Sequence, residues 1–301
     1  MIELGGLPED AWQRALKERE KSLRNCYETL MSYESAKIQL VNPTYFVPGW
    51  TAENSSIWSE EFPSSEECYK PLKHWIDRII VNPEYARIVD LKEESQGSSS
   101  FVELGNRLKE KLVDHKENET ISLVGHSMGG LDIRAAVLND EKPVLKVRDF
   151  ITLGAPNRGA FRAGYFKFDF FVQWFTKKEK PLTSDQLAQA KSMAMDSPDI
   201  REINQKKSWL TLTERIERFF IFMGLKDMAV QNTPEVDKED IPEDIFKAKF
   251  KIIQTTGTEH TGRHGITQDP RIQLPVLSAL CGLELKDEFN YGYVVREYGD
   301  I

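Results

Sequence analysis

Cysteine is scarce in this chain, with only Cys26, Cys68 and Cys281 among 301 residues. The three are far apart and form no C-x-x-C pair, so neither a disulfide framework nor a zinc site is indicated. We therefore expect a reducing compartment, and the cytoplasm is the expected location. A secreted chain from which a signal peptide has been removed would have the same features.

No signal peptide is expected from the start of the sequence, which also has no long apolar run and no excess of positive charge. It begins Met1-Ile2-Glu3-Leu4 and soon becomes strongly charged, unlike a signal peptide, and no stretch approaches the length of a membrane-spanning helix. The formal net charge is −8. A general nucleic-acid binder is not expected, because no broad basic face is available to neutralise phosphates.

One stretch of the chain has the order typical of a strand, a sharp turn and a helix. Residues 120–124 form a short apolar run, the next five read Gly-x-Ser-x-Gly, and the residues after them suit a helix. Glycine is needed at 125 and 129 because a Cβ there would collide with the neighbouring helix and strand. The turn exposes the hydroxyl of Ser127, and the first N–H groups of the new helix point toward it. The N–H of Met128 is therefore expected to stabilise an oxyanion.

This turn resembles the nucleophile elbow of α/β-hydrolases, and of lipases and esterases in particular. The resemblance implies a mostly parallel central sheet with helices on both faces. The rest of the pattern favours the same architecture, because apolar β-type runs alternate with helical patterns at 66–80 and 101–115. The predicted strands cover 45–47, 85–90, 120–124, 150–153, 219–223 and 250–255.

The chain divides into an N-terminal extension, a core and an insertion. Residues 1–40 are predicted to be a helical extension, since apolar positions recur at helical spacing among many charges from Pro8 to Ala36. The α/β-hydrolase core is expected at 41–156 and 219–301. The β/α rhythm lapses between the two, and 157–218 is interpreted as a helical cap or lid.

Two further segments resemble lipases. The run at 45–47 ends at Pro48-Gly49-Trp50, which resembles the His-Gly-x loop of those enzymes with Pro in place of His, and this implies the Trp50 N–H as the second oxyanion donor. The alternative is an ordinary turn at the end of a strand. Residues 152–159 read Thr-Leu-Gly-x-Pro-x-x-Gly, a pattern that follows the elbow in many lipases.

The acid of a catalytic triad is expected in a loop after a late strand. Asp227 follows the strand at 219–223 within Gly-x-x-Asp-x-x-Val, which resembles the lipase version of that loop. Asp237 and Asp240, in a charged loop further along, are weaker alternatives.

The base is restricted by the small number of histidines, of which there are five. Two precede the serine and His126 lies inside the elbow, so the chain order Ser, acid, His leaves His260 and His264. The segment 264–272 resembles the lipase pattern in which the catalytic His precedes a small residue, an aliphatic residue and Asp-Pro at the last helix. It favours His264 as the base, with His260 as the alternative.

The predicted cap is rich in aromatic side chains between 161 and 175. We interpret them as the lining of an acyl pocket under a lid. Ordinary core packing is an equal alternative, because aromatic runs are usually buried, and contact with a membrane surface is a rival interpretation. The residues chosen for the pocket are Phe166, Phe170, Phe171 and Trp174.

These residues favour a serine hydrolase that cleaves carboxylic esters through a Ser-His-Asp triad and an acyl-enzyme. The expected partner is a small-molecule ester or lipid. The chemistry requires no metal or cofactor, and a serine at the elbow argues against the dehalogenase and epoxide-hydrolase branches, which need a carboxylate there. Thioesterase, acyltransferase and deacylase of a lipid or glycolipid are alternatives on the same triad, and a non-catalytic binding protein is the alternative from another class.

Overall fold

The computed structural model describes most of the chain, and every structural statement below refers to the described part. It comprises residues 9–50, 57–59, 68–113, 119–140, 145–160, 183–224, 227, 241–255, 258–260, 264–283 and 293–295.

A seven-stranded sheet with the order β2-β1-β3-β4-β5-β6-β7 organises the fold. The first six strands in this order are parallel, and β7 pairs antiparallel with β6 at one edge. This is the mostly parallel sheet that the sequence predicted. The strands are β1 (Thr44–Val47), β2 (Ala86–Ile88), β3 (Thr120–His126), β4 (Lys146–Leu153), β5 (Ile216–Gly224), β6 (Phe250–Thr255) and β7 (Tyr293–Val295).

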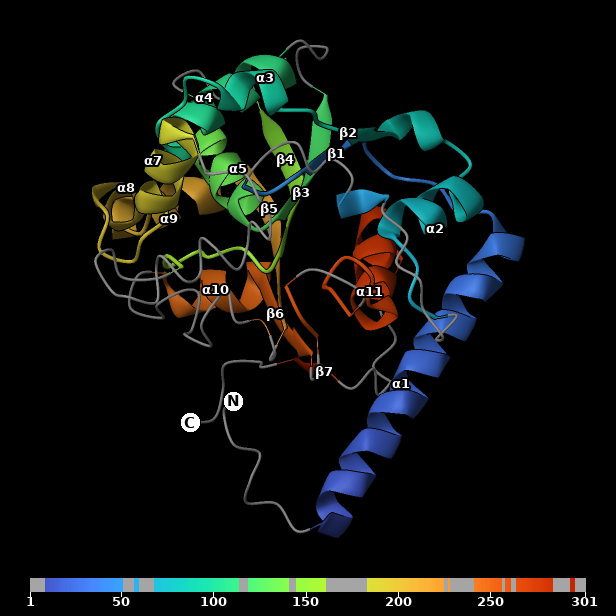
Figure 1. Ribbon diagram of the computed structural model, residues 1–301. Coiled ribbons are helices and arrows are strands. Elements are labelled where there is room, and N and C mark those ends of the chain that lie inside the picture. The colour runs from blue at the N-terminus through green and yellow to red at the C-terminus, as the bar shows by residue number, and fades with distance from the viewer. Residues whose placement is uncertain are drawn as a thin grey trace.

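Helices cover both faces of the sheet. Figure 1 shows α1, α2 and α11 on one side, with α4, α5 and α7 to α9 on the other. The helices on the first side are α1 (Glu9–Ala36), α2 (Leu72–Ile79) and α11 (Pro270–Leu280). The remaining helices are α3 (Lys92–Ser95), α4 (Phe101–Val113), α5 (Met128–Leu138), α7 (Ser184–Ser192), α8 (Pro198–Ile203), α9 (Lys206–Arg215) and α10 (Glu243–Lys249), with a 3-10 turn, η2, at Pro83–Tyr85.

The strands are apolar on both faces because each face is covered by helices. In β5, Phe219 and Ile221 belong to the core cluster shared with α4, α5 and α9, while Phe220 and Phe222 belong to the cluster shared with α1, α2 and α11. This period of two follows from the alternation of side chains along a strand. The result is two hydrophobic cores separated by one sheet.

The predicted N-terminal helix forms α1, which packs against α2 and α11. Figure 1 shows its N-terminal end extending well beyond the sheet. Its buried positions include Leu23, Cys26 and Leu30, which belong to the core cluster on that side of the sheet. Tyr27 adds an edge-to-face contact with Trp75 of α2, with ring centroids 5.6 Å apart. The helix therefore docks on the core, as its apolar stripe requires.

The carboxyl ends of the central strands meet at one edge of the sheet. Val47 is in register with Gly125, His126 with Leu153, and Gly224 with Thr255. Ligands bind outside this edge in open α/β sheets. The loops that follow β1, β3, β4, β5 and β6 therefore start beside one another, and all the predicted catalytic residues lie in them.

Part of the predicted cap lies in the described residues. Helices α7, α8 and α9 follow one another between 183 and 215, and buried side chains of α8 and α9 join the core cluster around α5. The strand after them begins at Ile216, three positions before the predicted boundary at 219. The aromatic segment, with Phe166, Phe170, Phe171 and Trp174, lies outside the described residues. No helix in the described part of the chain is long and apolar enough to cross a membrane.

Candidate active site

Ser127 occupies a strained turn between β3 and α5. Its φ is +52° and its ψ is −128°, a left-handed backbone that side-chain-bearing residues rarely adopt. A Cβ at Gly125 would lie 2.6 Å from the Gly130 nitrogen, and one at Gly129 would overlap the carbonyls of Val47 and Pro48. The predicted reason for both glycines is therefore confirmed by the geometry of this turn.

The serine is the N-cap residue of α5, but its side chain makes no capping hydrogen bond. The hydroxyl is therefore not used to satisfy the start of the helix. Met128 is the first residue of α5, and the first N–H groups of a helix have no acceptor within the helix. The Met128 N–H therefore stays the predicted oxyanion donor beside Ser127.

The loop after β1 lies directly against the serine. A Cβ at Gly49 would stand 2.7 Å from the Cβ of Ser127, so only glycine permits this approach. Trp50, the predicted second oxyanion donor, is buried, and its indole Nε1 donates to the Gln186 carbonyl at 3.2 Å. The loop is therefore anchored to α7 on one side while it lies against Ser127 on the other.

Asp227 and His260 form a buried pair next to this turn. His260 Nδ1 donates to Asp227 Oδ2 at 2.7 Å, and the two side chains are only 1% and 2% exposed. Asp227 is held by a turn at the end of β5, in which its N–H donates to the Gly224 carbonyl at 2.9 Å. With Nδ1 engaged by the carboxylate, Nε2 is the nitrogen that can exchange a proton with a nucleophile.

The sequence favoured His264 as the base, whereas the histidine paired with Asp227 in the structure is His260, the alternative. The ring of His264 packs against Tyr69, with ring centroids 4.9 Å apart. The Glu259 N–H donates to the His264 carbonyl and the Ile266 N–H donates to the Glu259 carbonyl, each at 2.9 Å, so the stretches around His260 and His264 lie side by side and run parallel. His260 and His264 therefore lie in two adjacent stretches of one loop, and the stretch with His260 contacts Asp227. The weaker acids, Asp237 and Asp240, lie outside the described residues.

A short segment after β4 joins the serine to the Asp227–His260 pair. The Leu153 carbonyl accepts from the Ser127 N–H at 3.0 Å. The next residue, Gly154, has a φ of +60°, and a Cβ on it would lie 2.8 Å from Asp227 Oδ2 and 3.1 Å from His260 Nδ1. Leu153 and Gly154 therefore bring together the three residues of the candidate triad. Gly154 was visible in the Thr-Leu-Gly segment, but its role in the site was not.

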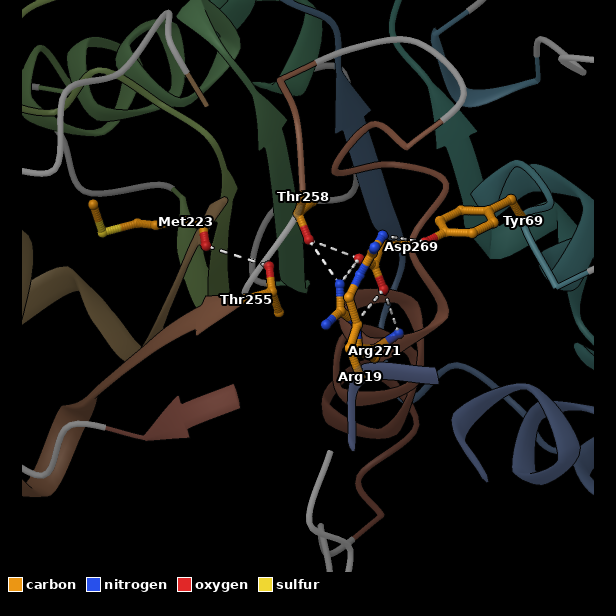
Figure 2. A network of polar contacts seen from close by, with 7 residues as sticks. All are labelled: Arg19, Tyr69, Met223, Thr255, Thr258, Asp269 and Arg271. Atoms are coloured by element: carbon orange, nitrogen blue, oxygen red, sulfur yellow. Dashed lines mark hydrogen bonds and ion pairs between the residues drawn. The ribbon is translucent and has the colours of Figure 1, made fainter. Parts of the chain in front are cut away.

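A second buried network, formed by Thr258, Asp269 and Arg271, supports the loop that carries His260. Figure 2 shows these residues in close-up. Asp269 Oδ2 accepts from Thr258 Oγ1 at 2.7 Å and from Arg271 Nη2 at 2.6 Å. Burial alone would raise the pKa of Asp269, but the charge and hydrogen bonds of Arg271, together with Thr258, outweigh burial and hold the pKa below its usual value. Asp269 also caps α11 through the Arg271 N–H. Thr258, two residues before His260, is thus held at the N-terminus of α11.

Among the described residues, no group of three or more His, Cys, Asp and Glu side chains is placed to hold a metal ion. Ser127, the His260–Asp227 pair and the loops after β1 and β4 lie together at the edge of the parallel sheet. These parts define an α/β-hydrolase.

The profile of the palmitoyl protein thioesterase family matches residues 63–219, just over half of the chain. The chain belongs to this family. No curated protein matches the sequence. The matched region includes the elbow and the segment after β4, but ends before Asp227 and His260.

Comparison with solved structures finds similar chains at low sequence identity. Phospholipase PlaB from Legionella pneumophila is 13% identical with a TM-score of 0.52, covering 82% of this chain and 61% of that chain. The RedJ thioesterase from Streptomyces coelicolor is 11% identical with a TM-score of 0.47, covering 81% and 91%. Carboxylesterase CesB from Bacillus subtilis is 12% identical with a TM-score of 0.44, covering 88% and 99%. At such identities the likeness concerns the fold alone, and the PlaB match supports it.

Proposed function

We propose that this protein hydrolyses acyl compounds with Ser127 as nucleophile, His260 as general base and acid, and Asp227 as the residue that orients His260. The observation that carries the proposal is the buried 2.7 Å contact between His260 and Asp227. Leu153 and Gly154 connect this pair to Ser127, which lies in a strained turn. An imidazole–carboxylate pair shielded from water in this way stabilises the imidazolium that forms during acyl transfer.

The reaction proceeds in two halves. His260 Nε2 takes the hydroxyl proton while Ser127 attacks the acyl carbonyl, and the resulting oxyanion is held by the N–H groups of Met128 and Trp50. The tetrahedral intermediate then collapses, the leaving group departs with the proton from His260, and the acyl group stays on the serine. Water repeats the sequence on the acyl-enzyme and regenerates the free hydroxyl.

Two substrate classes fit this machinery, oxoesters and thioesters. The lipase-like motifs of the sequence favour a carboxylic ester, whereas membership in the palmitoyl protein thioesterase family favours a thioester. The chemistry of the leaving group separates them. An alkoxide requires a proton from His260 to leave, while a thiolate leaves readily without one because a thiol has a pKa near 8.5.

The aromatic segment remains our proposal for the acyl-binding part of the site. Both of its flanks belong to elements beside the site: the Ala160 N–H donates to the Met193 carbonyl at 2.9 Å just after α7, and α7 itself accepts from the Trp50 indole. If Phe170 and Phe171 line an acyl pocket, replacing them with alanine changes the preference among acyl chain lengths while the protein remains folded. An unchanged preference would assign them to the core.

A matched pair of substrates tests the proposed function. Octanoyl esters of N-acetylethanolamine and N-acetylcysteamine differ only in the oxygen or sulfur atom of the scissile bond, and each is assayed with the wild type and Ser127→Ala. We expect turnover of at least one by the wild type, loss of both in Ser127→Ala, and labelling of Ser127 by a fluorophosphonate probe. Preference for the sulfur compound would establish a thioesterase, and preference for the oxygen compound an esterase. Absence of labelling at Ser127 contradicts the proposal.

A further inference from the structure

His126, the residue before Ser127, lies between the loop after β6 and the loop after β1. Its Nε2 is 3.2 Å from the carbonyl oxygen of His260, and the two imidazole rings are 4.9 Å apart. On its other side, Nδ1 is 3.3 Å from the position that a Cβ on Gly49 would occupy, in the loop proposed to form the oxyanion hole. Trp58 meets the ring edge-on at 6.2 Å, and His126 is only 3% exposed.

The contact with His260 has a defined direction. Burial lowers the pKa of His126 to about 3, and the charge of a protonated His260 adds a smaller contribution in the same direction. The ring is therefore neutral near neutral pH and carries a single proton. Because a carbonyl oxygen can only accept, that proton is on Nε2, and Nε2–H donates to His260.

A neutral donor suits this position better than a charged one. During catalysis His260 becomes an imidazolium, and a cation 4.9 Å away would oppose that charge. A neutral Nε2–H holds the main chain of His260 without this cost. Asp227 fixes the side chain of the same residue through Nδ1, so backbone and side chain are fixed from two separate elements, β3 and the loop after β5.

We propose that His126 is a positioning residue, whose Nε2–H holds the His260 carbonyl and thereby sets the direction of the His260 imidazole toward Ser127. The inference rests on the proposed function, since it assigns His126 a role in the same triad. His126 precedes Ser127 in the chain and also holds the main chain of His260. A shift of the turn at Ser127 would therefore move His260 with it.

Three substitutions separate the hydrogen bond from the packing of the ring. His126→Phe keeps a flat ring and removes the donor. His126→Gln places an amide N–H where Nε2 was, whereas His126→Asn places its amide near the position of Nδ1 and does not reach His260. We expect Phe and Asn to lower kcat by about 10- to 100-fold with KM changed less than about threefold, because a displaced base costs rate rather than binding. Gln should remain within about fivefold of the wild type.

The pH dependence of kcat/KM supplies a readout that packing does not move. It reports the titration of the base in the free enzyme, so we expect a displaced midpoint in Phe and Asn and a wild-type midpoint in Gln. Equal kcat and equal midpoints in all four proteins would overturn the proposal. Gln as impaired as Phe would overturn it too, because the ring and not the donor would then matter. If Phe does not fold, the contrast between Gln and Asn decides the question by itself.

A measurement without turnover keeps this test apart from that of the proposed function. In a Ser127→Ala background, proton NMR detects the low-field signal of the His260 Nδ1–H held by Asp227. We expect the signal to persist with His126→Gln and to broaden or shift with His126→Asn. An identical signal in both overturns the positioning role even if the wild type proves to be an active hydrolase. A wild type without turnover would instead defeat the proposed function, and the signal would still report on His126.

Discussion

His260 and Asp227 lie 33 residues apart in the chain, yet their Nδ1 and Oδ2 atoms are 2.7 Å apart and both side chains are almost wholly shielded from water. Their meeting follows from the sheet, because β5 and β6 are parallel neighbours and Gly224 at the end of one is in register with Thr255 at the end of the other. Asp227 follows Gly224 closely in the chain and His260 follows Thr255 closely, so the carboxylate and the imidazole meet beside this edge of the sheet. The pair therefore belongs to the edge of the sheet and not to either loop alone.

The first prediction distinguishes the two histidines. His260→Ala removes the proposed base and should lower kcat by about 10³-fold or more, since removal of a triad member has effects of this size. His264→Ala removes a ring that packs on Tyr69 and should keep kcat within about tenfold. Turnover of a short p-nitrophenyl ester by both variants, with melting temperatures recorded for each, decides between them. The opposite ranking would restore His264 as the base.

The second prediction concerns the acid. Asp227→Asn keeps the shape of the side chain but removes the charge that selects the Nδ1–H tautomer and stabilises the imidazolium, so kcat should fall by about 10²- to 10⁴-fold. Asp77→Asn is a matched control, because Asp77 is exposed and pairs with Lys73 four residues earlier on the surface of α2. It should leave kcat unchanged. An Asp227→Asn variant with wild-type kcat would remove Asp227 from the triad.

The third prediction uses two glycines with similar backbones. Gly154 has a φ of +60° and Gly97 a φ of +77°, so alanine is strained at both and should cost about 1–2 kcal/mol of unfolding free energy. Only at Gly154 does the new Cβ meet Asp227 and His260; at Gly97 the nearest atom is Arg107 Nη2 at 3.9 Å. Gly154→Ala should therefore also lower kcat by about tenfold or more, while Gly97→Ala should not. Equal kcat in the two variants would mean that the segment after β4 does not shape the site.

The fold was predictable from the sequence because the physical cause of each strand is local. Residues such as Phe219 to Met223 are apolar without interruption, which is expected only of strands covered on both faces. The elbow was predictable for a similar reason, since a serine with positive φ between two close approaches of backbone demands glycine at fixed spacing. The helix at 66–80 was predicted too long, because α2 begins at Leu72 after Pro71.

The pairing of His260 with Asp227 could not be predicted from the sequence because it depends on backbone contacts within one loop. His260 and His264 are four residues apart in one loop, and backbone hydrogen bonds between Glu259 and the 264–266 segment decide which of them faces the acid. Such bonds leave no side-chain pattern. The same holds for His126, whose proposed role depends on the carbonyl of His260, 134 residues away. Roles of this kind follow from long-range contacts and not from spacing.

Asp132, in the helix α5 that follows Ser127, is a buried carboxyl with no exposed surface. Neither of its oxygens has a hydrogen-bond partner in the described structure. Burial raises its pKa well above the ordinary value of 3.8. The folded state therefore binds this proton more tightly than the unfolded state does, so Asp132 costs no stability below about pH 4 and costs progressively more as the pH rises toward the folded-state pKa.

The fourth prediction follows from this sign. Asp132→Asn has no titrating group, so it should stabilise the protein by about 1–3 kcal/mol at pH 7.5, and the gain should disappear near pH 4. Asp149→Asn is the matched control, because Asp149 is equally buried but accepts from Ser122 Oγ at 2.9 Å and from Arg218 Nε at 2.7 Å. It should destabilise the protein, since Arg218 and Ser122 lose a charged acceptor. Urea unfolding of the three proteins from pH 4 to 8 measures both effects. A destabilised Asp132→Asn at pH 7.5 would contradict this prediction. It would show that the Asp132 carboxyl stabilises the fold at that pH.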